Sequence, residues 1–118
     1  MYKSRVMEIG HDALSFDEEN IIILFGPKAP KELKDVAIIH HELENSDEYP
    51  IKKGGKLVID NQVYEITALG SVANKNLQEL GHVSVYFTDS NEGVLPGSIY
   101  VKPNIFPKIK TDSLIMFE

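Results

Sequence analysis

The sequence contains no cysteine. Without cysteine the chain cannot form a disulfide, present a thiolate nucleophile, or build a cysteine-based zinc or iron–sulfur site. Any covalent intermediate must therefore form on a histidine, serine, threonine, lysine, tyrosine or carboxylate side chain.

Long hydrophobic runs are also missing. The longest, Ile21–Phe25, has the length of a strand and is ended by Gly26-Pro27, whereas a membrane-spanning helix needs about 20 apolar residues. The first residues, from Met1 to Arg5, lead into no apolar core of the kind that a signal peptide requires. We therefore expect a cytoplasmic protein without direct membrane insertion.

Clustered basic charge is scarce. The chain has 12 Lys and Arg against 18 Asp and Glu, which gives a net charge of −6. The basic clusters are limited to Lys52-Lys53 with Lys56, and Lys108 with Lys110. Because affinity for a phosphate backbone rests on clustered Lys and Arg, neither nucleic acid nor an anionic membrane is an expected partner. An acidic protein more readily meets a basic protein surface.

What the sequence does contain is a series of short, β-branched segments bounded by turn formers, which is the pattern of β-strands. The predicted strands are Val6–Ile9, Ile21–Phe25, Asp35–Leu43, Lys56–Ile59, Val63–Leu69, His82–Thr88, Ile99–Lys102 and Leu114–Phe117. Asp60-Asn61-Gln62 predicts the turn of a hairpin between two of them.

Two short helices are expected among these strands, at Pro30–Lys34 and Val72–Leu80. Gly81 is a typical C-terminal cap for the second helix, and Ser71 or Asn74 could cap its N-terminus. The length fits one domain over residues 1–118. The predicted class is mainly β: a small antiparallel β-barrel, or a sandwich, of about 6–8 strands with one or two short helices.

Common catalytic and ligand-binding motifs are absent. Gly54-Gly55-Lys56 lacks the spacing of a P-loop, and His41-Glu42 begins a zinc-protease pattern that Asn45 breaks where the second histidine is needed. An imidazole has a pKa near 6.5, so at neutral pH one ring nitrogen is free to act as a nucleophile or a ligand. The candidates for chemistry are therefore the histidines: His11, His40, His41 and His82.

His40 and His41 stand side by side at the end of an apolar run. Neighbours in a strand point to opposite faces, so one histidine should face the core and the other the solvent. Because both faces of the run are apolar, periodicity does not decide which histidine faces the core. His82 is either a polar residue bonded to a free carbonyl or a second imidazole of a site. Gly70-Ser71, just before the helix, either caps it or offers backbone amides to an anion.

Residues 70–83, Gly-Ser-Val-Ala-Asn-Lys-Asn-Leu-Gln-Glu-Leu-Gly-His-Val, closely resemble the glucitol/sorbitol-specific IIA component of the bacterial phosphoenolpyruvate-dependent sugar phosphotransferase system (PTS). The similarity extends to Ala29-Pro30 with Leu33, the run into His40, Val63–Gly70, Leu95-Pro96-Gly97 and Phe117-Glu118. It implies a phosphocarrier that takes a phosphoryl group from the phosphohistidine of HPr and passes it to the IIB part of a IIB/IIC transporter. No cofactor is implied.

In this family the phosphoacceptor is a histidine at the end of the apolar strand, which corresponds here to His40. Family members carry a second histidine slightly further along, whereas here His41 follows directly; it is the second candidate, as acceptor or as hydrogen-bond donor to the phosphoryl group. His82 and the amides near Gly70-Ser71 are further candidate donors. The competing interpretations are a metal-binding barrel that uses His40 or His41 with His82 and Glu42, and a non-catalytic regulatory or sugar-binding domain.

Overall fold

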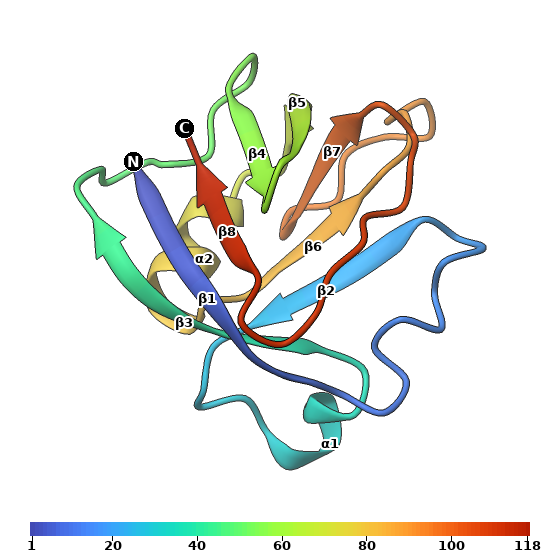
Figure 1. Cartoon of the computed structure of the whole chain (residues 1–118). Coiled ribbons are helices and arrows are strands. Elements are labelled where there is room, and N and C mark those ends of the chain that lie inside the picture. Colours follow the sequence, from blue (N-terminus) through green and yellow to red (C-terminus); the bar gives the residue numbers. More distant parts are fainter.

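A computed structural model describes all 118 residues. The chain forms a closed barrel of eight strands (Figure 1). The strands are β1 (Tyr2–Ile9), β2 (Ile21–Phe25), β3 (Ile38–Asn45), β4 (Lys56–Ile59), β5 (Gln62–Leu69), β6 (Val83–Tyr86), β7 (Ser98–Lys102) and β8 (Leu114–Phe117). Their order around the barrel is β1-β3-β2-β6-β7-β5-β4-β8. The barrel therefore closes between the first and last strands of the chain, which pair with each other.

The predicted mainly-β barrel is confirmed, and most neighbouring strands are antiparallel, including the predicted hairpin of β4 and β5. Two pairs, β2 with β3 and β6 with β7, run parallel instead. Parallel neighbours need a long crossover connection. Here residues 26–37, which contain the short helix α1 (Lys31–Lys34), join the first pair, and residues 87–97 join the second.

The barrel encloses one large apolar cluster. Val83, Val85 and Phe87 are each 0% exposed, as the alternation of residues 82–88 predicts. A second, smaller cluster of Phe25, Ala29, Ala37 and Ile39 comes from the segments that flank α1. Strand β3 is therefore covered on both faces where it begins, which explains why both faces of its sequence are apolar.

Helix α2 (Ala73–Leu80) joins β5 to β6 and buries Ala73 and Leu77. It ends at Gly81, which has a left-handed backbone with φ of 66° and donates its N–H to Leu77 O, so the predicted C-terminal cap is confirmed. The predicted N-terminal cap is wrong, because no side chain caps this end. Asn74 instead bonds to both backbone polar groups of Ile51, at 2.8 and 2.9 Å.

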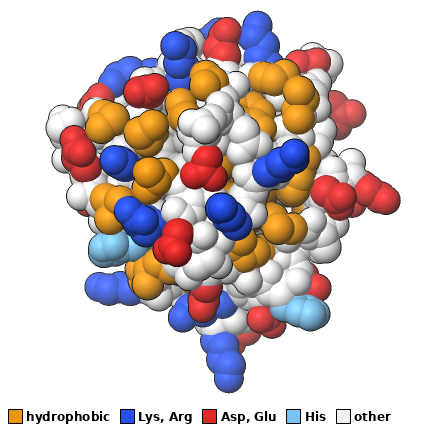
Figure 2. Space-filling model, in the orientation of Figure 1, with side chains coloured by type: hydrophobic (Ala, Val, Ile, Leu, Met, Phe, Trp, Pro, Cys, Tyr) orange, Lys and Arg blue, Asp and Glu red, His pale blue; other side chains and the backbone are white.

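Charged side chains of both signs are interspersed over the face of the molecule shown in Figure 2. The ion pairs join Lys52 to Asp47 and Lys102 to Glu65, and His11 lies beside Asp12. That face shows no continuous stripe of Lys and Arg. None of the helices combines the length and the hydropathy that crossing a membrane requires.

Candidate functional site

Strand β3 places His40 and His41 on opposite faces of the barrel wall. His40 lies on the same face as Ile38, which belongs to the barrel core, and is only 1% exposed. His41 lies on the face of Ile39 but beyond the small cluster at α1, and it is exposed. The expectation that one histidine faces the core and the other the solvent is confirmed, and His40 is the inward one.

Both ring nitrogens of His40 have hydrogen-bond partners. Nδ1 lies 2.7 Å from Ser4 Oγ, and Nε2 lies 2.7 Å from the carbonyl oxygen of Gly81. A carbonyl oxygen only accepts hydrogen bonds, so Nε2 carries the ring proton and donates it to Gly81 O. Nδ1 then accepts a hydrogen bond from the Ser4 hydroxyl. The structure thus holds a neutral imidazole in one defined tautomer.

The surroundings of His40 favour this neutral form. Burial lowers the pKa of His40 below its ordinary value, because the charged ring would lose its solvation; the hydrogen bond to Gly81 and the negative charge of Glu42 act in the opposite direction. The ring therefore enters any reaction at neutral pH without a charge of its own.

We expect this lowered pKa to make folding sensitive to mild acid. In the unfolded chain the imidazole takes up a proton as the pH falls through about 6.5, whereas the folded ring resists protonation. Stability should therefore fall as the pH drops below about 6.5, toward the lower pKa of folded His40. Urea denaturation of the wild type and His40→Gln between about pH 5 and 7.5 measures this, and the variant should have the shallower pH dependence.

The exposed neighbour supplies the control for that measurement. His41→Gln removes an imidazole from the same strand without removing a buried one. It should keep most of the pH dependence of the wild type, because the buried His40 remains in place. Identical slopes for the wild type and His40→Gln would contradict the assignment of the acid sensitivity to His40.

A cavity of about 320 Å³ adjoins His40. Its wall consists of Tyr2, Phe25, Gly26, Pro27, Lys28, His40, His41, Glu42, Leu77, Gln78, Glu79, Leu80 and Gly81. Gly81 belongs to this wall and Ser4 does not, so the Nε2 edge of His40 is turned toward the cavity and the Nδ1 edge toward the barrel interior. Lys28 is the only Lys or Arg in the wall, where it stands with the carboxylates of Glu42 and Glu79. An anion in the cavity would thus meet one cation, two carboxylates and the His40 ring.

The carbonyl of Gly81 is held in place by tight packing at the end of α2. A Cβ atom at Gly81 would lie 2.8 Å from Gly26 N and 3.4 Å from His40 Nε2. The N–H of Gly26 in turn donates to Leu80 O at 2.9 Å, which ties the end of β2 to the end of α2. Glycine is therefore needed at position 81 both for its left-handed backbone and for this close approach.

His82 does not belong to the wall of the His40 cavity. Its ring stacks on Phe25, with the ring centroids 4.4 Å apart and the planes inclined by 15°. The ring is half-buried, and this burial lowers the pKa of His82. The structure thus shows a packing role for His82 and does not bring it into the cavity as a second imidazole.

Gly70 and Ser71 lie at the opposite end of α2 from His40. The eight residues of α2 span about 12 Å, which separates the amides near Gly70 from the Gly81 carbonyl at the other end. Gly70 and Ser71 line a different cavity, of about 530 Å³. Helix α2 therefore keeps these amides apart from His40, and the prediction that they assist a phosphoryl group has no support in this geometry.

Sequence reasoning missed two partners of His40, namely Ser4 and the carbonyl of Gly81. The sequence pattern predicts a first strand that begins at Val6, but β1 begins at Tyr2, so Ser4 lies within it. Ser4 stands between Tyr2 and Val6 at alternate, buried positions. A single serine among alternate apolar residues that face the barrel interior is the signal that identifies Ser4. No such signal exists for the Gly81 carbonyl, because every residue has a backbone carbonyl.

The donors of the alternative metal site are not assembled. No group of three or more His, Cys, Asp or Glu side chains is placed so that it could hold a metal ion. Glu42 and the two adjacent histidines line the His40 cavity, but His82 lies outside it. His11 is exposed beside Asp12, at 4.0 Å. The metal-binding interpretation therefore loses the donor set on which it depended.

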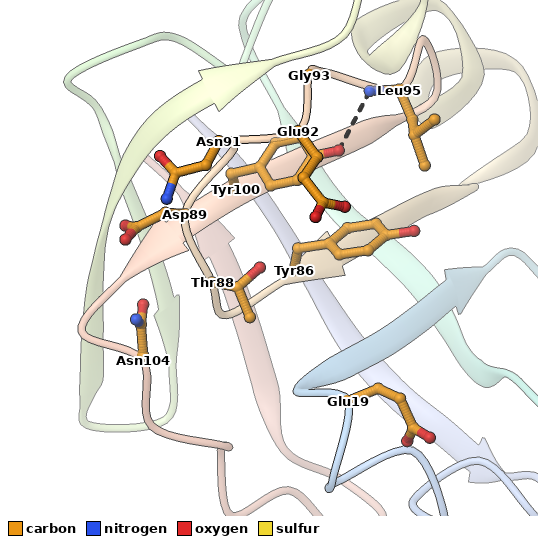
Figure 3. A pocket seen from close by; sticks show the side chains of 10 residues that line it. All are labelled: Glu19, Tyr86, Thr88, Asp89, Asn91, Glu92, Gly93, Leu95, Tyr100 and Asn104. Carbon is orange, nitrogen blue, oxygen red and sulfur yellow. Dashed lines mark hydrogen bonds between the residues drawn. The ribbon is translucent and has the colours of Figure 1, made fainter.

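A third, larger cavity of about 610 Å³ has no histidine in its wall (Figure 3). It is lined by Glu19, Tyr86, Thr88, Asp89, Asn91, Glu92, Gly93, Leu95, Tyr100 and Asn104. The rings of Tyr86 and Tyr100 stack at 4.9 Å, and the Tyr100 hydroxyl accepts a hydrogen bond from Leu95 N (Figure 3). With three carboxylates and no Lys, Arg or His in its wall, this cavity disfavours a phosphoryl group and offers no imidazole to accept one.

Comparison with known proteins gives matches over nearly the whole chain. The family profile described as "PTS system glucitol/sorbitol-specific IIA component" matches residues 1–116. Proteins of Escherichia coli (strain K12) and Shigella flexneri, both named "PTS system glucitol/sorbitol-specific EIIA component", are each 32% identical over 120 residues, which is 100% of this chain and 94% of theirs. The crystal structure of a PTS system IIA component from Enterococcus faecalis V583 superposes with a TM-score of 0.84 at 34% identity and covers 98% of each chain.

Proposed function

Because the chain belongs to the glucitol/sorbitol-specific IIA family of the PTS, we propose that it is a phosphocarrier in the uptake and phosphorylation of sugar alcohols. It accepts a phosphoryl group from the phosphohistidine of HPr and passes it to the IIB component of a IIB/IIC transporter. The names of its relatives specify glucitol and sorbitol, and we propose the same substrates for the transporter that this chain serves. Residues 1–118 act as one IIA domain in the cytoplasm.

His40 is the proposed phosphoacceptor, and Nε2 is the proposed accepting atom. The observation that carries this assignment is the placement of His40 in a cavity wall, with Nε2 hydrogen-bonded to Gly81 of the same wall. The resemblance of residues 70–83 and of the run into His40 to the IIA family points to the same residue. His41 lines the same cavity from the exposed face and is the second candidate.

The geometry sets a condition for transfer. Phosphoryl transfer between imidazoles needs an in-line nucleophile and charge stabilisation, with little further covalent apparatus. In the resting structure Nε2 donates to Gly81 O, so this hydrogen bond must be broken before Nε2 can attack a phosphorus atom. Lys28, in the same wall, is placed to offset the charge of the incoming group. Docking of a partner over the cavity would exclude water from the labile bond.

A phosphorylation assay tests the proposed function. The untreated protein is incubated with phosphoenolpyruvate, enzyme I and HPr, and its metal content is measured in parallel. We expect one acid-labile phosphoryl group per chain, located on a histidine, and no label when HPr is left out. Stoichiometric metal without phosphoryl transfer would support the metal-binding alternative, and neither metal nor transfer would support a non-catalytic domain.

A further inference from the structure

We propose that Ser4 is the positioning residue for phosphoryl transfer, because its hydroxyl holds Nδ1 of His40 in both tautomers that the acceptor must adopt. This inference rests on the proposed function, in which His40 accepts the phosphoryl group on Nε2. It assigns a role to a buried serine of β1 that lies outside the cavity wall.

The burial of Ser4 is the first observation. Ser4 is 0% exposed and lies in the barrel interior between the inward positions of Tyr2 and Val6. A hydroxyl in such a place is costly unless it is hydrogen-bonded. Its one side-chain hydrogen bond is the 2.7 Å contact with His40 Nδ1. An apolar residue would pack at this position at lower cost, so the contact with His40 is what the hydroxyl contributes.

The two partners of His40 differ in what they can accept or donate. In the resting tautomer Nε2 carries the proton and has no lone pair with which to attack phosphorus. To become a nucleophile, the neutral ring must carry that proton on Nδ1 instead. The carbonyl of Gly81 cannot bond to an unprotonated Nε2, whereas a hydroxyl that donated to Nδ1 can rotate and accept from it. The tautomer change therefore releases Nε2 from Gly81 while Ser4 keeps the ring oriented.

The transfer step then needs no further proton. The bond between phosphorus and His40 Nε2 forms as the bond between phosphorus and the imidazole nitrogen of HPr breaks, and the electron pair of the broken bond stays on the HPr ring. The proton on Nδ1 remains between the His40 ring and Ser4 Oγ. Because the phosphorylated ring gains positive charge, this hydrogen bond becomes charge-assisted and stronger than in the resting state.

Three variants test the role of Ser4 in the rate of phosphorylation by phospho-HPr. Ser4→Ala removes only the hydroxyl, and we expect the rate to fall by about tenfold to a hundredfold, the usual effect of losing a hydrogen bond to a charged group. Ser4→Thr keeps a hydroxyl and should restore most of the rate. Ser98→Ala is the matched control, because Ser98 is another buried strand serine, 4% exposed, on β7; it should react like the wild type.

A spectroscopic measurement separates positioning from a merely structural role. In nitrogen-15 NMR of the phosphorylated wild type, the Nδ1 proton of His40 should exchange slowly with water, and in phosphorylated Ser4→Ala it should exchange fast. An unchanged rate in Ser4→Ala, a rate loss with unchanged Nδ1 exchange, or fast Nδ1 exchange in the wild type itself would each overturn the inference. Failure of the proposed function is distinct, because the wild type would then take no phosphoryl group or carry it on His41.

Discussion

We expect His40→Ala to abolish phosphorylation by phospho-HPr, with a loss of at least about a thousandfold, because the variant lacks the nucleophile itself. His41→Ala should retain the reaction within about tenfold, since it removes a group from the cavity rim without touching the bonds that orient His40. The measurement is the transfer rate from phosphoenolpyruvate through enzyme I and HPr, followed by mass mapping of the phosphorylated residue in each protein.

Burial makes this result informative about mechanism. His41 is exposed and His40 is 1% exposed, so a reaction governed by accessibility alone would select His41. Selection of His40 would mean that the ordered ring, with its Nε2 edge toward the cavity, decides the acceptor. Phosphorylation that continues at the full rate in His40→Ala and is lost in His41→Ala would overturn the assignment. Circular dichroism of both variants checks that each remains folded.

The second large effect concerns Gly70. A Cβ atom at Gly70 would lie 2.1 Å from Leu95 O and 2.2 Å from Pro96 O, and both of these are backbone atoms. The chain must therefore shift to accept any side chain at this position. We expect Gly70→Ala to lower the free energy of unfolding by about 3–5 kcal/mol and the thermal midpoint by about 10–20 °C. Thermal and urea denaturation measure the two quantities.

Two controls accompany the Gly70 variant. Gly97→Ala places its Cβ near only one atom, the side-chain Asn76 Nδ2 at 3.2 Å, so the neighbour can move and the cost should be small. Ser71→Ala alters an exposed residue beside Gly70 and should leave both stability and phosphorylation unchanged. Loss of phosphorylation in a stable Ser71→Ala would show that the N-terminal end of α2 does take part in transfer.

Much of the local structure could be predicted from the sequence. The alternation of a strand depends on residues that are close together in the sequence, such as Val83, Val85 and Phe87. The C-terminal end of α2 is likewise indicated locally, by Gly81. Parallel pairing of β2 with β3 could not be predicted in this way, because pairing direction depends on how a long connection crosses the barrel.

For the site itself, the sequence determined which residue types were available: no thiol, a pair of adjacent histidines, and a long pattern of the IIA family at residues 70–83. Tertiary structure decided which histidine is buried. The start of β3 is apolar on both faces, and the two faces differ only because one packs in the barrel core and the other against the small cluster at α1. It also decided the partners of His40, since Ser4 and Gly81 lie 36 and 41 residues away along the chain. Contacts over such distances are set by barrel closure and not by local pattern.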